Sequence, residues 1–419
     1  MAVSFARAGR RVVGVDVDTR RVARLMEGGS YILDVAATDV AATLAAGTLR
    51  ATTDYDALKD ADAIFICVPT PFDAMRAPDL SYIISAAEGI AQRLQRGQMI
   101  VLQSTTYPGT TEEVVQPILE RSGLRAGADF DIAFSPERID PGRSDWNVTN
   151  TPKVVGGGRP DATRRASELL RVIGAPVVEV SSPKAAEMTK LLENIFRSVN
   201  IALVNELALL CERMGIDMWE VIAAAKTKPY GFMPFTPSAG VGGHCIGVDP
   251  YYLSWKAREF DFYTKFIELA AEVNQSMPFH VVDLVERALS NQHQSTKDAA
   301  VLVLGVAFKR DVDDARNSPA ERVIELLLKR GARVTFHDPY VSRFGFGGDV
   351  FLREQRELLS QPLSESLLEK SDCVVIVTGH RAIDYNFVVK HARAVVDSCN
   401  ATEFVKQGRE KVVRLGAGA

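Results

Sequence analysis

The chain has 419 residues, of which 47% are hydrophobic and 24% charged, and its formal net charge is −4 at pH 7. This length suits two or three domains, and the nearly balanced charge excludes the basic surface typical of nucleic-acid-binding proteins. No apolar run reaches the roughly 20 residues of a membrane-spanning helix, and no signal peptide is recognisable. Since the five cysteines show no paired spacing, we expect a cytoplasmic protein without disulfides or a bound metal.

The first residues predict a short helix that ends at Gly9, and a buried strand follows over 11–18. A strand ending in an acid is typical of the second strand of a dinucleotide-binding domain, where the acid binds the ribose hydroxyls. Asp16 fits this position, and the alternative is a solvent-exposed acid at a strand end. The strand and the Gly-x-Gly-x-x-Gly turn that open such domains are absent from the chain as given.

Further strands are predicted at the spacing of an α/β domain, over 63–68, 99–103, 131–134, 153–156 and 176–180. Continuous apolar runs of this kind indicate a parallel sheet covered on both faces. Thr70, Thr105 and Glu137 each follow one of these strands. Since open α/β sheets bind ligands at the carboxyl ends of their strands, these three residues are candidate ligand contacts.

Ser182 and Pro183 predict the start of a helix that runs to about Met214. At about 1.5 Å per residue this helix is over roughly 40 Å long, which suits a link between domains or a contact with a partner subunit. Lys190 and Asn194 share one face of it with Glu187. That face either lines a cleft or is a solvated stripe.

Residues 242–252 read Gly-Gly-His-Cys-Ile-Gly-Val-Asp-Pro-Tyr-Tyr, so that Cys245 lies in a glycine-rich turn four residues before Asp249. A thiol in such a turn with a carboxylate nearby suits covalent catalysis at a carbonyl carbon. The alternative is a tight turn with a half-buried cysteine.

A polar stretch over 290–297 predicts a linker into a second α/β sheet, with strands over 299–304, 333–336, 373–377 and 394–396. Lys309 and Arg316 follow the first of these strands, next to a Ser-Pro helix start, and this arrangement suits an anionic ligand. The glycines of 345–348 are interpreted as a flexible connector.

Six motifs, in this order, closely resemble the UDP-glucose/GDP-mannose dehydrogenases over nearly the whole chain. They are CVPTP at 67–71, STTYPGTT at 104–111, SPER at 135–138, EMTKLLEN at 187–194, GGHCIGVDPYY at 242–252 and GVAFKRDVDDARNSPA at 305–320. The SPERIDPG form and the His-Cys pair are most similar to the branch that acts on UDP-N-acetylhexosamines.

The resemblance implies an α/β protein with two Rossmann-like parallel-sheet domains joined by a long central helix. Residues 1–182 would bind NAD and lack the first strand and glycine turn of that domain. Residues 183–292 would form a central dimerisation domain that carries the cysteine loop, and 293–419 would bind UDP. The chain would form a homodimer through the central helix.

Enzymes of this family oxidise the C6 alcohol of a nucleotide sugar to a carboxylate with two NAD+ per turnover. The resemblance implies that Cys245 attacks the intermediate aldehyde, giving a thiohemiacetal that is oxidised to a thioester and hydrolysed. Lys190 and Asn194 would stabilise charge on the C6 oxygen, and Asp249 would help to move protons. Thr105 and Glu137 would complete the catalytic contacts. The implied NAD contacts are Asp16, Arg21, Thr70 and Thr105, and the implied substrate contacts are Glu137, Arg138, Lys190, Asn194, Gly242, Gly243, Tyr252, Lys309 and Arg316.

Three positions in the aligned motifs depart from the family. Pro141 stands where some members carry a second glutamate, and Gly247 stands where the acetylhexosamine branch usually has proline. Cys399 stands where an arginine often contacts the substrate. Because the pyrophosphate turn is also absent, we expect the chain as given to bind NAD weakly.

UDP-GlcNAc is the best estimate of the substrate, for polysaccharide or glycan precursor synthesis, and UDP-ManNAc, UDP-GalNAc and UDP-glucose are alternatives. An inactive nucleotide-sugar-binding paralogue is a second hypothesis. A two-electron hydroxyacid-type dehydrogenase is a third, which would leave Cys245 without a role. The three hypotheses predict two, zero and one NADH per nucleotide sugar, respectively.

Overall fold

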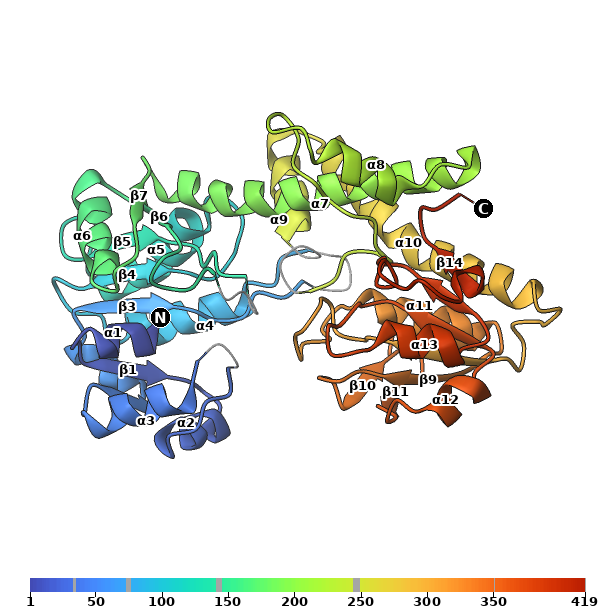
Figure 1. Cartoon of the computed structure of the whole chain (residues 1–419). Helices are drawn as coiled ribbons and strands as arrows, with labels where there is room; N and C mark the ends of the chain where they lie inside the picture. The colour runs from blue at the N-terminus through green and yellow to red at the C-terminus, as the bar shows by residue number, and fades with distance from the viewer. Residues whose placement is uncertain (33–34, 73–76, 141–144, 244–248, 350, 419) are drawn as a thin grey trace. The chain divides into compact units, whose positions relative to one another are not determined.

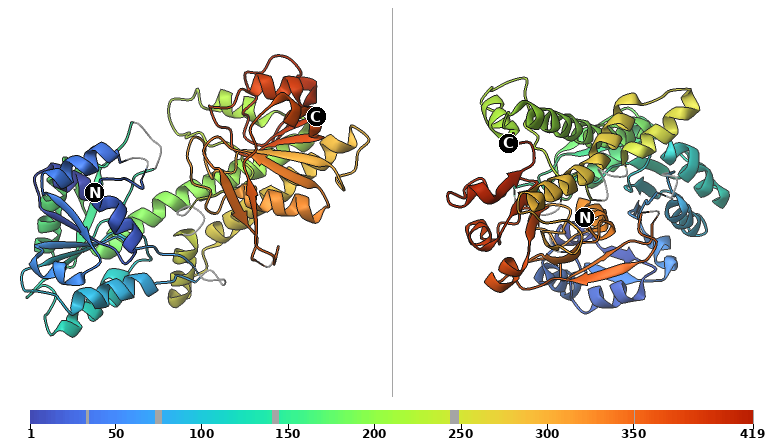
Figure 2. Two further views of the ribbon diagram at one scale, coloured as in Figure 1. Left: turned by 90° about the horizontal axis from the view of Figure 1, so that it is seen from below. Right: turned by 90° about the vertical axis from the view of Figure 1, so that its right-hand side faces the viewer.

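A computed structural model describes the chain except for residues 33–34, 73–76, 141–144, 244–248, 350 and 419. The chain divides into two compact units, one comprising residues 1–193 and 251–263 and the other 194–250 and 264–419. Their elements can be followed in Figure 1 and from two further sides in Figure 2. Each unit is described by itself.

The first unit contains a sheet in two parts. The smaller part pairs β1 (Val12–Val15) in parallel with β2 (Leu49–Thr52). The strands of the larger part are, in spatial order, β3 (Ala63–Ile66), β4 (Met99–Leu102), β5 (Asp131–Phe134), β6 (Lys153–Gly157) and β7 (Val177–Glu179). Among the described residues no strand joins β1 to β3, as expected for a dinucleotide-binding sheet without its first strand.

Helices cover both faces of the larger part of this sheet. All four residues of β4 and of β5 are buried, which explains their continuous apolar sequence. On β4, Ile100 packs with α4 and α5, whereas the next residue, Val101, packs with α6 on the opposite face. The helices of this unit are α1 (Ala2–Arg7), α2 (Thr19–Met26), α3 (Ala37–Ala45), α4 (Ser81–Ala91), α5 (Gln116–Leu119) and α6 (Pro160–Arg171).

Helix α1 packs against both parts of this sheet. Its Phe5 is buried, packs against Val12 of β1, and lies with its ring centroid 5.6 Å from that of Phe65 on β3. A single aromatic side chain therefore contacts the two strands that have no common strand neighbour among the described residues.

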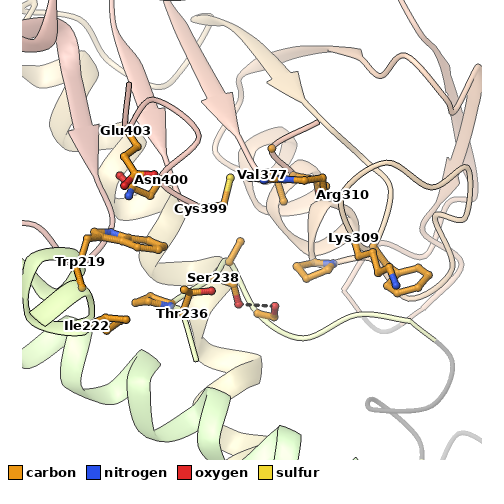
Figure 3. Close-up of a pocket in the computed structure, with 18 of the residues that line it drawn as sticks. Trp219, Ile222, Thr236, Ser238, Lys309, Arg310, Val377, Cys399, Asn400 and Glu403 are labelled. Atoms are coloured by element: carbon orange, nitrogen blue, oxygen red, sulfur yellow. Dashed lines mark hydrogen bonds between the residues drawn. The ribbon is translucent and has the colours of Figure 1, made fainter. Parts of the chain in front are cut away.

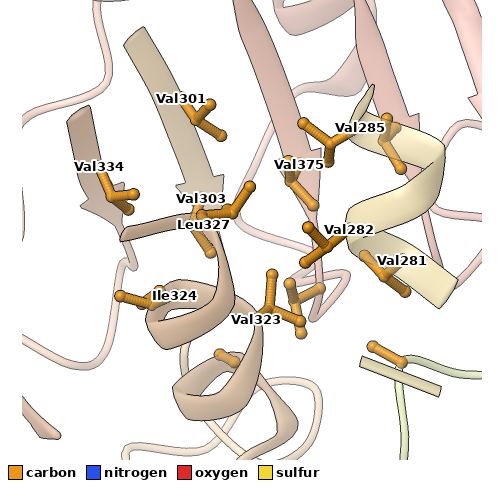
Figure 4. Packing of buried hydrophobic residues seen from close by; sticks show 14 of the residues in the cluster. Val281, Val282, Val285, Val301, Val303, Val323, Ile324, Leu327, Val334 and Val375 are labelled. Atoms are coloured by element: carbon orange, nitrogen blue, oxygen red, sulfur yellow. The ribbon is translucent and has the colours of Figure 1, made fainter. Parts of the chain in front are cut away.

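The second unit contains a five-stranded parallel sheet and the helices that cover it. The strands are, in spatial order, β14 (Val412–Arg414), β13 (Val395–Asp397), β12 (Cys373–Ile376), β8 (Ala300–Leu304) and β9 (Arg333–His337). The helices are α8 (Met218–Ala225), α10 (Lys265–Ser290), α11 (Pro319–Lys329), α12 (Glu365–Lys370) and α13 (Tyr385–His391). Figure 4 shows one side of this core, where valines of β8, β9 and β12 face Val282 of α10 and Leu327 of α11.

Two further helices complete the chain. Helix α7 (Pro183–Met214) is a continuous 32-residue helix whose residues up to Glu193 belong to the first unit and the rest to the second. Helix α9 (Asp249–Ala257) is also divided: its residues up to Pro250 belong to the second unit and the rest to the first. The prediction of a long central helix is confirmed.

Some predicted elements are wrong in detail. The first sheet is not wholly parallel, since β5 and β6 are antiparallel. The glycines interpreted as a connector belong partly to strand β10 (Arg343–Phe346), which pairs with β11 (Arg356–Leu359) in a hairpin. Helix α10 begins only at Lys265, after Asp261, which takes a left-handed conformation with φ 52°.

Among the described residues, α7 alone is long and apolar enough, by length and composition, to cross a bilayer. One third of its most apolar 18-residue window is buried in the protein. The buried residues of α7 include the polar Glu187, Lys190 and Asn205, which face protein in this structure. This is weak evidence for a membrane span, because core helices of soluble proteins meet the same criterion.

Candidate active site

The shared face of Glu187, Lys190 and Asn194 on α7 is buried. Glu187 accepts hydrogen bonds from the backbone N–H groups of Gly109 (2.6 Å) and Thr111 (2.9 Å) and from the Thr111 hydroxyl (2.7 Å). Burial raises the pKa of the Glu187 carboxyl, and these hydrogen bonds oppose the increase. Glu187 therefore anchors the loop that follows β4, on which Thr105 lies half-buried.

Lys190 is 8% exposed, and its ammonium forms no hydrogen bond or ion pair with any residue that the structure describes. Lys190 therefore has the free donors needed to bind an oxygen of a ligand.

Asn194 lies one turn after Lys190 and donates a hydrogen bond from Nδ2 to Oδ2 of Asp249 at 2.5 Å. Both side chains are buried, with 9% and 2% of each residue exposed. Asp249 is also the first residue of α9, where the helix dipole favours a negative charge. The structure thus brings together two of the residues predicted from sequence. Cys245 and Gly247 lie outside the described residues.

The two glycines before Cys245 pack tightly against residues 308–319 of the same unit. Gly243 has φ 86°, and a Cβ there would lie 2.9 Å from the Phe308 ring. A Cβ on Gly242 would lie 2.8 Å from the carbonyl oxygen of Asn317, and the N–H of Gly243 donates to the carbonyl of Arg316 at 3.2 Å. Only glycine fits this contact without strain.

The predicted NAD contacts in the first unit follow β1, β3 and β4, at the carboxyl ends of these parallel strands. Asp16 accepts a hydrogen bond from the N–H of Asp18 at 2.8 Å, and its carboxylate lies 3.6 Å from the Arg21 guanidinium. Thr70 is buried, and its carbonyl oxygen accepts a hydrogen bond from the Tyr252 hydroxyl. Tyr252, predicted as a substrate contact, is itself fully buried.

These residues fit the ribose and nicotinamide halves of a dinucleotide, since an acid follows the second strand position and small polar side chains follow the next two strands. The described residues contain no glycine-rich turn to hold the pyrophosphate. The fit to NAD is therefore partial.

Glu137 forms an ion pair with the fully buried Lys153. Its Oε1 accepts hydrogen bonds from Lys153 Nζ at 2.7 Å and from the backbone N–H groups of Arg138 (2.8 Å) and Ile139 (3.2 Å). Burial raises the pKa of the Glu137 carboxyl. The fully buried Lys153 and these donors lower the pKa by more than burial raises it, so the pKa is below its ordinary value. Such a carboxylate is a weak proton acceptor. Arg138 binds Glu193 of α7 through Nη2 at 2.5 Å and through Nε at 3.3 Å.

The second unit contains a cavity of about 560 Å³. As Figure 3 shows, residues of α8, of the segment before the glycine turn and of the loops that follow β8 and β13 line it, and Lys309 is among them. Arg316 is not a lining residue of this cavity among those described, and its guanidinium binds the carboxylate of Asp314 at 2.6–3.1 Å.

Sequence reasoning missed the segment 236–240 that lines this cavity and the asparagines that hold it. The Asn205 side chain of α7 accepts a hydrogen bond from the N–H of Ser238 at 2.9 Å and donates one to Asn274 of α10 at 3.0 Å. Asn274 in turn donates to the carbonyl of Ser198 at 3.1 Å. Asn205 lies three helical turns after Asn194, within the mostly apolar run over 201–211. A polar residue in such a run was the available signal in the sequence.

Models of three domains of one family match the chain. Residues 1–173 match the NAD binding domain, 184–276 the central domain and 302–404 the UDP binding domain of the UDP-glucose/GDP-mannose dehydrogenase family. The chain belongs to this family. The resemblance predicted from six motifs is therefore confirmed, and so are an oxidoreductase activity and NAD as its cofactor.

Individual relatives are UDP-N-acetylhexosamine dehydrogenases. The chain is 39% identical over 344 residues to a UDP-N-acetyl-D-glucosamine 6-dehydrogenase of Pseudomonas aeruginosa, covering 82% of this chain and 80% of the relative. It is 34% identical over 405 residues to a UDP-N-acetyl-D-mannosamine dehydrogenase of Pyrococcus horikoshii, covering 95% and 92%. A solved structure of UDP-D-ManNAc dehydrogenase from Pyrococcus horikoshii has a TM-score of 0.89 at 32% identity, covering 100% of this chain and 96% of that one. The protein is thus an NAD-dependent dehydrogenase of the UDP-N-acetylhexosamine type.

Proposed function

We propose that the protein oxidises the C6 alcohol of UDP-GlcNAc to the carboxylate in two two-electron steps. The observation that carries this proposal is Lys190, a residue 8% exposed whose ammonium has no partner among the described residues and which shares a helix face with Asn194. Relatives acting on UDP-GlcNAc and on UDP-ManNAc have similar identity to this chain, so UDP-ManNAc is the principal alternative substrate. UDP-GalNAc and UDP-glucose are further alternatives.

Lys190 would bind the C6 oxygen and stabilise the negative charge that develops there when a hydride leaves C6. In a buried site this interaction is strong, because water does not screen it. NAD, when bound in the first unit, would supply the hydride acceptor for both oxidation steps.

Cys245 would act as the nucleophile, a role that rests on the family resemblance. Its sulfur would form a bond to the aldehyde carbon, giving a thiohemiacetal. Loss of the second hydride would give a thioester, and water would then break the C–S bond to release the acid and the thiol. Covalent capture keeps the aldehyde bound between the two oxidations.

Asp249 would orient the hydrolytic water and accept a proton from it. Its hydrogen bond from Asn194 and its place at the start of α9 hold this side chain in position. Glu137 would act as a positioning residue, because Lys153 and two backbone N–H groups already occupy Oε1. Asp16, Arg21, Thr70 and Thr105 would contact NAD.

The cavity of the second unit would hold the uridine diphosphate, with Lys309 as one of its cations. Arg316, predicted as a substrate contact, is not among the described residues that line this cavity, and we propose that it contacts the diphosphate from beside it. We retain the three-domain division at 182 and 292 as part of the proposal. The product, a nucleotide-linked uronic acid, would serve polysaccharide or glycan synthesis in the cytoplasm.

We also propose a homodimer formed through α7. Exposed apolar residues repeat along its part in the second unit at helical spacing, and they are Phe196, Leu203, Leu207, Leu210 and Met214, each 37–61% exposed. A continuous apolar stripe on one helix can pack against the same stripe of a second copy across a two-fold axis. Light scattering of the L203E/L210E variant should show a monomer, whereas F404E, which changes an exposed residue outside the stripe, should remain dimeric. Flotation of the wild type with liposomes would instead indicate a membrane contact.

Counting NADH tests the enzymatic proposal. A panel of the four UDP sugars is incubated with the protein and excess NAD+, and the NADH formed per sugar is measured at completion. Two NADH with UDP-GlcNAc supports the proposal. A yield of one indicates a two-electron dehydrogenase, and none with any sugar, despite UDP binding, indicates an inactive paralogue.

A further inference from the structure

Arg310 extends into the cavity of the second unit, next to Lys309. A Cβ built on Gly379 would lie 3.3 Å from Nη2 of Arg310 and 3.2 Å from Sγ of Cys399. The guanidinium and the thiol therefore lie around the same point, and the absence of a side chain at Gly379 leaves room for them. Figure 3 shows Arg310 and Cys399 among the side chains that line this space.

The Arg310 guanidinium forms no hydrogen bond or ion pair with the part of the chain that the structure describes. Other arginines nearby are paired, since Arg316 binds Asp314 and Arg381 binds Asp311. Glu403 also lines the cavity but forms no ion pair with Arg310. A cation that enters a cavity without forming an ion pair there is suited to bind an anionic ligand.

The backbone that carries Arg310 is held in place by a buried histidine. His380 is fully buried, and its Nδ1 accepts a hydrogen bond from the N–H of Asp311, the next residue, at 3.0 Å. Because Nδ1 is an acceptor, the proton is on Nε2, which donates to Oδ2 of Asp338 at 3.1 Å. The same Oδ2 accepts from the N–H groups of Val306 at 2.8 Å and Ala307 at 3.1 Å. The loop is thus fixed on both sides of Arg310, which reduces the entropy lost on binding.

We propose that Arg310 is a specificity-determining residue of this cavity that binds the diphosphate of a nucleoside diphosphate. The planar fork of an arginine can bind two phosphate oxygens at once, whereas the Lys309 ammonium binds as a point charge. This inference rests on the proposed function, because it assigns the nucleotide part of the substrate to the same cavity.

Calorimetric titration of the full chain with UDP, UMP and uridine tests this role without NAD or turnover. The R310A variant should bind UDP about tenfold or more weakly, because a charge-assisted contact is lost, and should bind uridine as the wild type does. R343A is the matched control, since Arg343 is exposed and pairs with Glu357 outside the cavity. It should bind UDP normally. R310K should show an intermediate loss.

A rescue experiment separates lost charge from lost structure. Cys399 Sγ and Arg310 Nη2 both lie next to Gly379. An arginine at position 399 can therefore place its guanidinium close to that of Arg310, so C399R in the R310A background should restore much of the affinity for UDP. Equal UDP affinity of R310A and wild type, or equal losses for UDP and uridine, would overturn the proposal. If R310A weakens UDP binding as expected but the wild type forms no NADH from any UDP sugar, the enzymatic proposal fails and the role of Arg310 stands.

Discussion

Asn194 and Asp249 are 55 positions apart in sequence, yet the carboxamide of one binds the carboxylate of the other at 2.5 Å in a buried environment. Replacing Asn194 with leucine would leave this carboxylate without one of its donors, which costs about 1–3 kcal/mol. We expect N194L to unfold at a lower urea concentration than wild type and to have a lower kcat. Unchanged stability and unchanged kcat in N194L would contradict a role for Asn194 in holding the carboxylate.

Lys190 provides a second prediction, in which activity and stability change in opposite directions. K190M should lower kcat by about 10²–10³-fold, because charge on the C6 oxygen loses its counter-charge. The same variant should unfold at a higher temperature, because methionine keeps the packing of a side chain on a residue that is 8% exposed and removes a charge that has no partner among the described residues. K184M is the control, since Lys184 is half exposed and pairs with Glu113. Unchanged kcat in K190M would exclude the proposed role.

Cys245 is tested by a small change in the nucleophile. C245S should abolish net formation of the uronic acid while UDP binding is retained, because an alcohol is a much weaker nucleophile than a thiolate. Calorimetry with UDP and NADH formation under excess UDP-GlcNAc are the two measurements. Full NADH production by C245S would exclude a covalent intermediate.

Glu325 of α11 predicts a pH dependence of stability. It is fully buried, and burial raises the pKa of its carboxyl from 4.5 to about 7, despite the Arg322 guanidinium at 2.6 Å. Since the folded state holds this proton more tightly than the unfolded chain, the contribution of Glu325 to stability is greatest below pH 4.5. It falls as the pH rises to about 7 and stays low above that.

The E325Q variant should therefore be more stable than wild type at pH 8, by up to about 3 kcal/mol, and the difference should vanish near pH 4. Arg322 keeps a partner in this variant, because it also binds Asp349 at 2.8 Å. Urea unfolding at both pH values measures this difference. E357Q, at an exposed glutamate, should leave stability nearly unchanged at both.

NAD affinity should depend on the two-part sheet of the first unit. We expect that adding a strand and a Gly-x-Gly-x-x-Gly turn before Met1 tightens NADH binding, because the strand would pair with β1 and β3 and the turn would offer N–H groups to the pyrophosphate. Fluorescence titration with NADH compares this chain with the 419-residue chain. A version whose turn glycines are valine separates completion of the sheet from binding of the pyrophosphate. Equal affinities of all three would refute the expectation.

The buried strands were predictable because β4 and β5 are buried on both faces and therefore read as continuous apolar runs. The short β2 was missed because its sequence, Leu-Arg-Ala-Thr, carries little of this signal. The antiparallel β6 was also not foreseen, since nothing in its own sequence distinguishes the two directions. The described residues between β5 and β6 form no crossover helix, and a parallel pair would need one.

The candidate site was predictable where its residues share one motif or one helix face. Lys190 and Asn194 are one turn apart, so helical periodicity relates them directly. Contacts between distant segments were not predictable, such as the ion pair of Glu137 with Lys153 or the hydrogen bonds from Asn205 to the cavity segment. Lys309 and Arg310 are adjacent in sequence, and nothing in the sequence indicates that both line the same cavity.

The close packing of Gly242 and Gly243 against residues 308–319 has a consequence for redesign of the enzyme. The support of the turn that leads to Cys245 is the same segment that carries Lys309, Arg310 and Arg316. Substitutions there that alter nucleotide preference would also displace the glycines, so selectivity and reactivity cannot be changed independently. Libraries that aim at a new nucleotide should therefore vary residues 236–240 and 399–403, which line the cavity from other elements, and leave 308–319 intact.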